Sequence, residues 1–285
     1  MPRKREFSVF CFGIPLRLPC PDFRRGFLFL VWELIMRIRR SVLLIVSLLG
    51  LLLAWQGVIW LTDLPDFILP SPMAVWARFV QLVRSGSLLR HFLTTLKEVL
   101  LGLALGASVA MTLGYLLAKS PLVERLLAPY IVASQSVPTV AIAPLLVIWF
   151  GPGLLSKVLI AALIVFFPVL VNTVVGVRAV PDDLHALMRS LQATRWQTLW
   201  MLEIPAALPV FLGGLRVGAT LAVIGAVVGE FVGSDSGLGF LINAGRGVYD
   251  TALVFVAVFV LIAMAMSLYG IVVSLENRLL AWQQD

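Results

Sequence analysis

The sequence predicts an all-α, polytopic membrane protein with about six transmembrane helices. Of its 285 residues, 60% are hydrophobic and 13% are charged, whereas soluble domains contain about 45–50% apolar and about 25% charged residues. The mean hydropathy of +1.01 supports the same class. A water-soluble globule has no way to bury so much apolar surface, so the composition excludes a soluble enzyme and a disordered chain.

Long stretches with few or no charged residues mark the candidate spans, since a spanning helix needs about 20 consecutive apolar residues. None of them alternates polar and apolar residues as the strands of a membrane β-barrel do, so a helical bundle is expected. In chain order the candidates are Ser41–Thr62, Val99–Ala118, Leu126–Ser156, Val158–Val177, Ile204–Gly229 and Thr251–Leu275.

The first 40 residues differ in composition from the remainder and are predicted to form a basic tail before a transmembrane domain at residues 41–280. The apolar run Gly26–Trp32 in this tail is too short to span a membrane. Met36 begins Met-Arg-Ile-Arg-Arg directly before the first candidate span and has the character of a natural start. We therefore expect residues 1–35 to be dispensable or to follow a mis-assigned start.

Basic residues predict the orientation, because Lys and Arg concentrate in cytoplasmic loops. Arg37, Arg39 and Arg40 precede the first span, which places the amino terminus in the cytoplasm. Six crossings return the carboxyl terminus to the same side, with Lys119 inside and Lys157 outside. The excess of Lys and Arg in cytoplasmic loops accounts for the net charge of +7. Nucleic acid is therefore not an expected partner.

The connection Pro181–Leu202 is far longer than the 2–8 residues that a bundle loop needs. Asp183 in its first turn suits a helix start, since carboxylates are stabilised by the helix dipole there. A turn at Ala193-Thr194 is expected to separate two short helices. One face is apolar and requires either a partner protein or the underside of the bundle; it consists of Leu184, Leu187, Met188 and Leu191, continued by Trp196, Leu199 and Trp200.

No pattern in the sequence predicts enzyme chemistry. There is no phosphate-binding loop of the form G-x-x-x-x-G-K-[ST], so we expect no nucleotide hydrolysis by this chain. His91 and His185 are its two histidines, and neither has Cys or carboxylate residues at metal-ligand spacing. We therefore predict no catalytic residue, no metal site and no cofactor in this chain.

Prolines and small residues interrupt several predicted spans. Pro138 and Pro144 are predicted to break the third span and Pro168 the fourth. Such breaks leave backbone groups that neighbours or water must satisfy, and they often border a cavity; a tolerated kink is the alternative. The fifth span carries Gly213–Ala219 and Gly225, and small residues let membrane helices approach closely.

Two ionisable residues lie in the fifth span. Arg216 and Glu230 are separated by about 21 Å along a helix, so they cannot neutralise each other. Arg216 is expected to extend toward the cytoplasmic face. Glu230, near the outer end, is a functional candidate because intramembrane carboxylates are costly; a salt bridge or a helix-end contact at the interface is the alternative. The predicted translocation path or gate comprises Pro138, Pro144, Arg216 and Glu230.

Several segments together resemble the permeases of ABC importers, and within these the nitrate/taurine/sulfonate group. Ser190–Thr198, then Ile204–Pro209 and Gly214-Leu215-Arg216, are similar to their cytoplasmic signature loop. Val228–Phe231 with Gly237–Ile242 is similar to the end of their fifth span and the loop that follows. The resemblance extends over roughly residues 36–280.

This resemblance implies a type I ABC importer permease fold in the cell inner membrane. It also implies a second permease copy, a cytoplasmic ATPase dimer that carries ATP and Mg, an extracytoplasmic solute-binding protein and surrounding membrane lipid. In the family the loop docks onto the ATPase. Carried over to this chain, the coupling residues are Asp183, Leu187, Met188, Arg189, Leu191, Gln192, Ala193, Thr194, Arg195 and Trp196.

The chain departs from the family pattern in this loop. The family has Glu-Ala-Ala followed four residues later by Gly, and this chain has Ala186-Leu187-Met188 and Gln192. The departure affects the docking contact, not the length or register of the loop. The amino-acid sequence of this chain at Leu187–Trp196 and at Ala222–Glu230 is more similar to permeases for pyrimidine vitamin precursors or riboflavin than to permeases for sulfonates.

The expected function is the transmembrane subunit of an ATP-driven importer. A stand-alone ion-coupled transporter or channel that uses Glu230 is the alternative. Such transporters often contain inverted repeats, which we do not find here, and more than one buried carboxylate, whereas Glu230 stands nearly alone in the predicted spans. A structural scaffold is a third class, but it leaves the long cytoplasmic loop unexplained.

Overall fold

The computed structural model describes residues 43, 46–47, 49–62 and 65–281. The chain divides into two units, Met1–Thr62 and Asp63–Asp285. The described part of the first unit contains the apolar helix Leu49–Thr62. The predicted tail of residues 1–40 lies outside the described residues, as do several positions at the start of the first predicted span.

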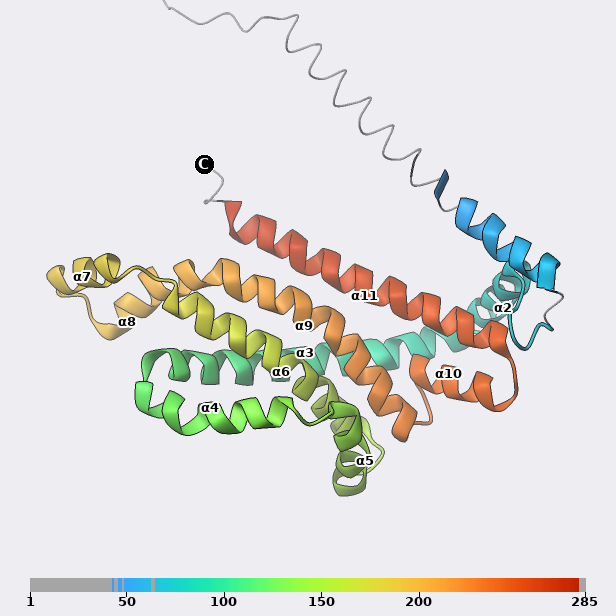
Figure 1. Ribbon diagram of the computed structural model, residues 1–285, viewed down its shortest axis with the longest axis horizontal. Helices are drawn as coiled ribbons and strands as arrows, with labels where there is room; N and C mark the ends of the chain where they lie inside the picture. The colour runs from blue at the N-terminus through green and yellow to red at the C-terminus, as the bar shows by residue number, and fades with distance from the viewer. Residues whose placement is uncertain (1–42, 44–45, 48, 63–64, 282–285) are drawn as a thin grey trace, which may run out of the picture. The chain divides into compact units, whose positions relative to one another are not determined.

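The described residues of the second unit form helices joined by short turns (Figure 1). Ser71, at the start of the first of these helices, accepts a hydrogen bond from the amide of Ala74 at 3.2 Å and so caps it. In chain order the helices are α2 (Pro72–Arg84), α3 (Ser87–Lys119), α4 (Pro121–Gln135), α5 (Thr139–Phe150), α6 (Leu154–Arg178), α7 (Asp182–Ser190), α8 (Arg195–Thr198), the π-helical segment η1 (Leu199–Glu203), α9 (Ile204–Val232), α10 (Leu238–Gly247) and α11 (Thr251–Leu279).

Four helical stretches in the described part of the chain are long and apolar enough to cross a membrane. They are Ser87–Lys119, Leu154–Arg178, Arg195–Val232 and Thr251–Leu279. Each contains one of the predicted spans, so the second, fourth, fifth and sixth predictions are confirmed as helices. Each is longer than the uncharged run because a helix continues through a charged residue whose side chain finds a partner.

The predicted third span is not one straight helix. Helices α4 and α5 meet at a bend of 97°, with Pro138 as the first residue outside α5. The break at Pro138 was predicted, and it arises because the residue before a proline is disfavoured in the helical conformation. The predicted break at Pro144 is wrong, since α5 continues through it.

The predicted interruption at Pro168 is also wrong, because α6 is continuous from Leu154 to Arg178. A proline removes one backbone hydrogen bond and crowds the preceding turn. One turn later, the side-chain amide of Asn172 donates to the carbonyl of Pro168 at 2.8 Å. The alternative, a proline that is tolerated within the span, therefore holds at Pro168.

Helices α3, α6 and α9 pack at the centre of the unit. A Cβ added at Gly106 of α3 would lie 2.5 Å from the carbonyl oxygen of Ala162, and one at Gly225 of α9 would lie 2.5 Å from the Cα of Ala161. Two helices therefore reach the same turn of α6 with no room for a side chain. The small-residue face predicted for the fifth span is confirmed at Gly225.

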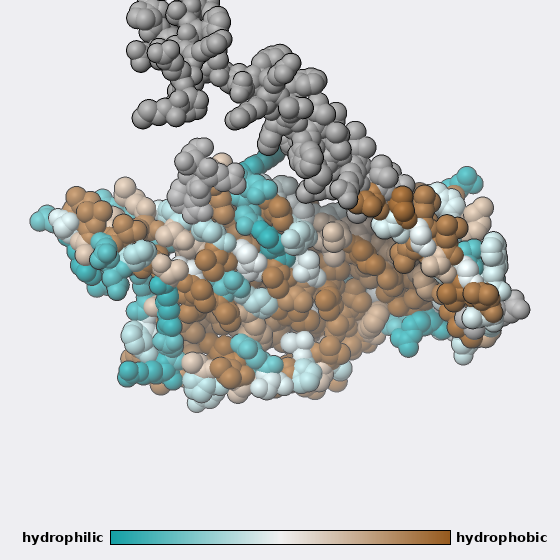
Figure 2. Space-filling view, turned by 45° about the horizontal axis from the view of Figure 1, so that its top comes forward, coloured by the Kyte–Doolittle hydropathy of each residue, from teal (hydrophilic) through white to brown (hydrophobic). Residues whose placement is uncertain are grey.

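The outer surface of the bundle is apolar. Figure 2 shows a broad band of hydrophobic residues on the face in view. Leu101 and Val109 of α3 and Ile262 and Met266 of α11 are all exposed. Exposed apolar area on this scale is typical of a surface in contact with lipid rather than water. Helices α7 and α8 lie at one end of the bundle, and α2 and α10 lie toward the other (Figure 1).

Candidate functional site

The segment between α6 and α9 forms two short helices, as predicted. In α8 the Thr194 hydroxyl accepts from the amide of Gln197 at 3.3 Å, and the Thr194 amide donates to the Gln197 side chain at 2.8 Å. This reciprocal pair is a capping box and fixes where α8 begins. Helix α7 has Asp182 and Asp183 in its first turn and Arg189 in its last, the charge order that suits the helix dipole.

The turn between α7 and α8 places Gln192 in the left-handed region, with φ of +53°. The amide of Ala193 donates to the carbonyl of Met188, and the amide of Gln192 donates to that of Arg189, both at 3.0 Å. These two bonds are the usual helix ending in which glycine is preferred. Gln192 lies at the position where the loop of the family described above has Gly. The chain therefore keeps the left-handed turn although it lacks glycine, the residue that adopts this conformation most easily.

The apolar face of this segment is uncovered. Leu191 and Trp196 are each 67% exposed, and Leu187 is 52% exposed. The rings of Trp196 and Trp200 contact each other edge to face, with centroids 5.6 Å apart. In the described structure, therefore, the bundle's own underside does not cover this face.

A buried carboxylate lies at the base of the same segment. Glu203 of η1 is 5% exposed. Its Oε1 lies 2.5 Å from Nζ of Lys119, and its Oε2 accepts from the Tyr115 hydroxyl at 3.0 Å. Glu203 was not among the predicted site residues, because it is the charged residue directly before the predicted span that begins at Ile204.

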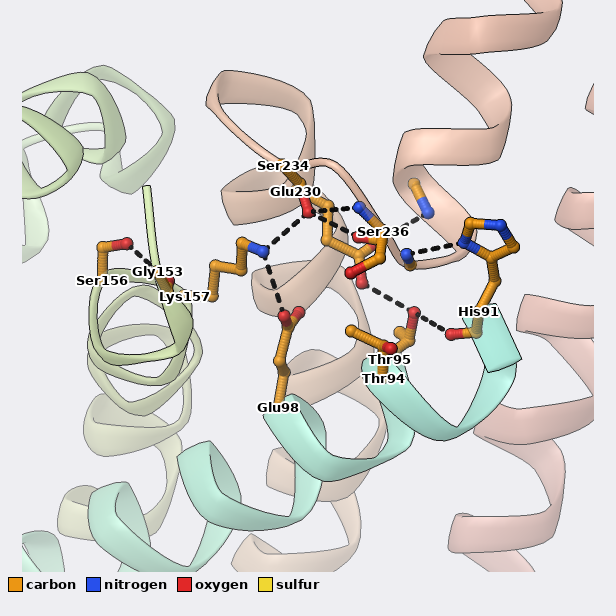
Figure 3. A network of polar contacts seen from close by, with 12 residues as sticks. His91, Thr94, Thr95, Glu98, Gly153, Ser156, Lys157, Glu230, Ser234 and Ser236 are labelled. Carbon is orange, nitrogen blue, oxygen red and sulfur yellow. Dashed lines mark hydrogen bonds and ion pairs between the residues drawn. The ribbon is translucent and has the colours of Figure 1, made fainter. Parts of the chain in front are cut away.

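Glu230 belongs to a second polar cluster, at the far end of α9 (Figure 3). It is 1% exposed, and its carboxylate accepts a hydrogen bond from the Thr95 hydroxyl of α3 at 2.6 Å. Lys157 of α6 lies 3.2 Å from the carboxylate of Glu98 and donates to the Ser234 hydroxyl at 2.6 Å. The cluster therefore joins α3, α6 and α9.

Glu230 does not stand alone, contrary to the sequence-based expectation. Glu98 and Lys157 were missed because each is the charged residue that bounds an uncharged stretch, at Val99 and Val158, and was taken to lie outside the span. Both are inside long helices and buried. What distinguishes Glu98 and Lys157 from other charges at span boundaries is the ion pair between them. That pair joins two helices and is visible only in the folded structure.

The same cluster fixes the start of α10. The first amides of a helix have no partner within it. Here Gly237 donates to Nδ1 of His91 at 3.0 Å, Leu238 donates to the hydroxyl of Thr95 at 2.8 Å, and Gly239 donates to the carboxylate of Glu230. Gly237 has φ of +115°. Three consecutive amides are thus held by side chains of α3 and α9.

The other predicted path residues lie apart from this cluster. Arg216 forms an ion pair with Glu276 of α11 and lies 5.6 Å from the centre of the Tyr269 ring. Its partner lies in the last turn of α11. Pro138, at the α4–α5 bend, and Pro144, inside α5, are both exposed. In the described part of the chain, no three His, Cys, Asp or Glu side chains converge as a metal site.

Residues 102–281 match the family model described as the inner membrane component of binding-protein-dependent transport systems. This match extends over more than half of the chain. The chain belongs to that family. The matched region includes helices α4 to α11 of this permease, and therefore the exposed α7–α8 segment and Glu230. His91, Thr95 and Glu98 precede the matched region.

Known proteins show the same relationship. The chain is 49% identical over 238 residues to the riboflavin transport system permease protein RibX of Chloroflexus aurantiacus, covering 84% of this chain and 89% of that protein. It is 37% identical over 218 residues to the formylaminopyrimidine transport permease protein ThiX of Halalkalibacterium halodurans, covering 76% of this chain and 87% of that protein.

A solved structure shows the fold. A chain of the MetNI methionine ABC transporter, in an inward-facing conformation, superposes with a TM-score of 0.61 at 16% identity, over 69% of this chain and 97% of that one. The permease therefore has the type I ABC importer fold that the resemblance implied.

Proposed function

We propose that this permease forms the translocation pathway of an ATP-driven importer and takes a small solute from an extracytoplasmic binding protein. A second permease copy and a cytoplasmic ATPase dimer complete the assembly. ATP and Mg bind to the ATPase, and the permease contributes no catalytic group. Family membership supports the transport role, and the uncovered apolar face of α7 and α8 is the observation that supports an ATPase partner.

The exposed face has the composition of a docking surface. Leu187, Leu191 and Trp196 are exposed at the end of the bundle, where basic residues predict cytoplasm. Burying one large apolar side chain contributes about 1.5–3 kcal/mol, and large aromatic residues are common anchors in protein interfaces. Charged Asp183 and Arg189 on the same short helix form a polar rim.

The same proposal assigns the orientation. The α7–α8 end faces the cytoplasm, where the ATPase is located, and both termini are on that side. The α10 end faces outward and receives the binding protein. Solute passes along the axis between the two permease copies, with α5 and α9 contributing Pro138, Pro144, Arg216 and Glu230 to the path or its gate.

The solute is proposed to be a heteroaromatic vitamin precursor. The relatives RibX and ThiX are named for riboflavin and formylaminopyrimidine, at 49% and 37% identity. In this proposal the binding protein selects the solute. A solute of the nitrate, sulfonate or taurine type is therefore compatible with the same permease fold.

Purification of the tagged permease from its native membrane, in mild detergent, tests the assembly. We expect an ATPase to co-purify in equal amount with the permease, and a binding protein to restore solute uptake after reconstitution with ATP. A homogeneous preparation without an ATPase that still transports solute would contradict the proposal. It would favour an ion-coupled transporter instead, with Glu230 as the first residue to substitute.

A further inference from the structure

Glu203 occupies an unusual position in the backbone. It is the last residue of η1, a π-helical segment inside the continuous helical stretch Arg195–Val232. Segments of π-helix are rare and are often found at functional sites. The wider turn presents a carboxylate to α3, where Lys119 and Tyr115 contact it.

The same carboxylate is the point at which α7 approaches the bundle. Nδ1 of His185 in α7 lies 3.9 Å from Oε1 of Glu203, which is a contact beyond hydrogen-bond distance. The His185 side chain is 21% exposed, whereas its neighbour Leu184 is exposed and no residue of α7 is fully buried. Glu203 thus contacts α3 on one side and α7 on the other.

An open hollow lies directly beside this contact. It has a volume of about 370 Å³ and is bordered by α3, α6, η1 and α9, with Tyr115 and Glu203 among the residues that line it. The helix backbones are nevertheless close-packed at this end, since a Cβ added at Gly176 of α6 would lie 3.0 Å from the carbonyl oxygen of Ala207 in α9. The hollow therefore gives room to the side chains around Glu203.

We propose that Glu203 is the positioning residue through which a displacement of the α7–α8 segment reaches α3. This inference rests on the proposed coupling function. When the segment moves, η1 moves with it, and the ion pair to Lys119 carries the movement to the end of α3. The hollow beside Glu203 gives the carboxylate and its neighbours room to shift.

The test uses the complete transporter, with its ATPase and binding protein, reconstituted in lipid vesicles. Glu203→Gln keeps the size of the side chain and removes its charge. We expect ATP hydrolysis to continue and the solute transported per ATP to fall about tenfold, within the usual range of coupling between sites. Glu124→Gln is the control, because it removes the exposed Glu124–Arg178 ion pair at the same end of the bundle; we expect it to leave the ratio unchanged.

A purely structural role would lower the amount of inserted transporter and leave the solute transported per ATP unchanged. Exchanging the two charges, in the double variant Glu203→Lys with Lys119→Glu, is expected to restore most of the lost transport per ATP. If Glu203→Gln fails to insert, Tyr115→Phe removes one contact to the carboxylate and is expected to lower the ratio to a smaller extent. An unchanged ratio in the inserted variant, or no rescue by the exchange, would overturn the inference.

The outcomes separate this inference from the coupling proposal. If Leu191→Asp leaves transport per ATP unchanged, the docking function of the α7–α8 segment is wrong. If Leu191→Asp abolishes coupled transport while Glu203→Gln retains it, docking stands and only the transmission through Glu203 is overturned.

Discussion

Among the described residues, each buried carboxylate of this permease has a partner on a different helix. Glu98 pairs with Lys157, and Glu203 pairs with Lys119, while Glu230 accepts from Thr95. Removing one member of a buried pair leaves an uncompensated charge and is strongly destabilising, whereas removing both members often is not. These pairs therefore make the relative placement of helices specific.

The Lys157–Glu98 pair supplies a direct prediction for stability. Lys157→Met is expected to destabilise the permease by about 3–5 kcal/mol, because it leaves a buried carboxylate unpaired. The double variant with Glu98→Gln should recover most of that loss. Thermal unfolding of the purified permease in detergent measures both. Equal unfolding temperatures for the single and double variants would show that the pair does not determine the stability of this end.

At the scale of elements, the α7–α8 segment is stabilised by interactions between residues close together in the sequence, and none of the residues of α7 is buried against the bundle. Its capping box at Thr194 and the turn at Gln192 depend on residues within a few positions of each other. Its apolar face, in contrast, has no partner in the described structure. The segment is therefore a well-formed local unit that presents Leu191 and Trp196 outward.

A charge placed on this face is expected to prevent docking. Leu191→Asp and Trp196→Asp should leave the permease inserted, since both positions are exposed, but lower ATP-driven uptake at least about tenfold, as expected for an interface anchor. Leu122→Asp is the matched control, because Leu122 is 68% exposed and lies outside the segment. Normal uptake by both segment variants would count against the docking surface.

The turn at Gln192 gives a second prediction at this scale. Gln192→Gly is expected to retain or raise uptake, because a left-handed conformation costs a non-glycine residue about 1–2 kcal/mol. Gln192→Val should lower uptake, since a branched side chain is least tolerant of that conformation. Uptake in reconstituted vesicles tests the pair. Uptake as low in the glycine variant as in the valine variant would show that the amide side chain itself is required, and not the backbone turn.

At the scale of the molecule, the permease has a close-packed centre and ends of different character. Gly106 and Gly225 bring α3 and α9 against α6. The α10 end is held by three amide hydrogen bonds from Gly237 to Gly239, and the opposite end contains the cavity beside Glu203. The two ends of the bundle are therefore built from different kinds of contact.

The packed centre predicts a strict requirement for glycine. Gly106→Val is expected to destabilise the permease by about 1–3 kcal/mol or more, because the new atoms meet the backbone of α6. Gly213→Ala serves as the control, since nothing lies within 4 Å of a Cβ there. The yield of folded permease in the membrane and its unfolding temperature measure the effect. Similar values for the two variants would contradict the close-packed centre.

The sequence by itself determined the membrane class, the helices around four predicted spans and the two-helix form of the α7–α8 segment. Each of these follows from local information, such as a run of apolar residues in Val158–Val177 or a cap at Thr194. It also selected Glu230 correctly as a buried carboxylate, since a charge late in an apolar run stands out.

Only the tertiary structure decided which charges meet. Three charges, Glu98, Lys157 and Glu203, each lie at the edge of an apolar run, so nothing local distinguishes them from solvated charges. The break at Pro138 follows from the proline itself, but the size of the bend between α4 and α5, 97°, and the continuity of α6 through Pro168 were beyond local pattern. The physical reason is the same in each case: the free energy of a buried charge or an interrupted helix depends on what the neighbouring helices supply, and that is a property of the packed bundle.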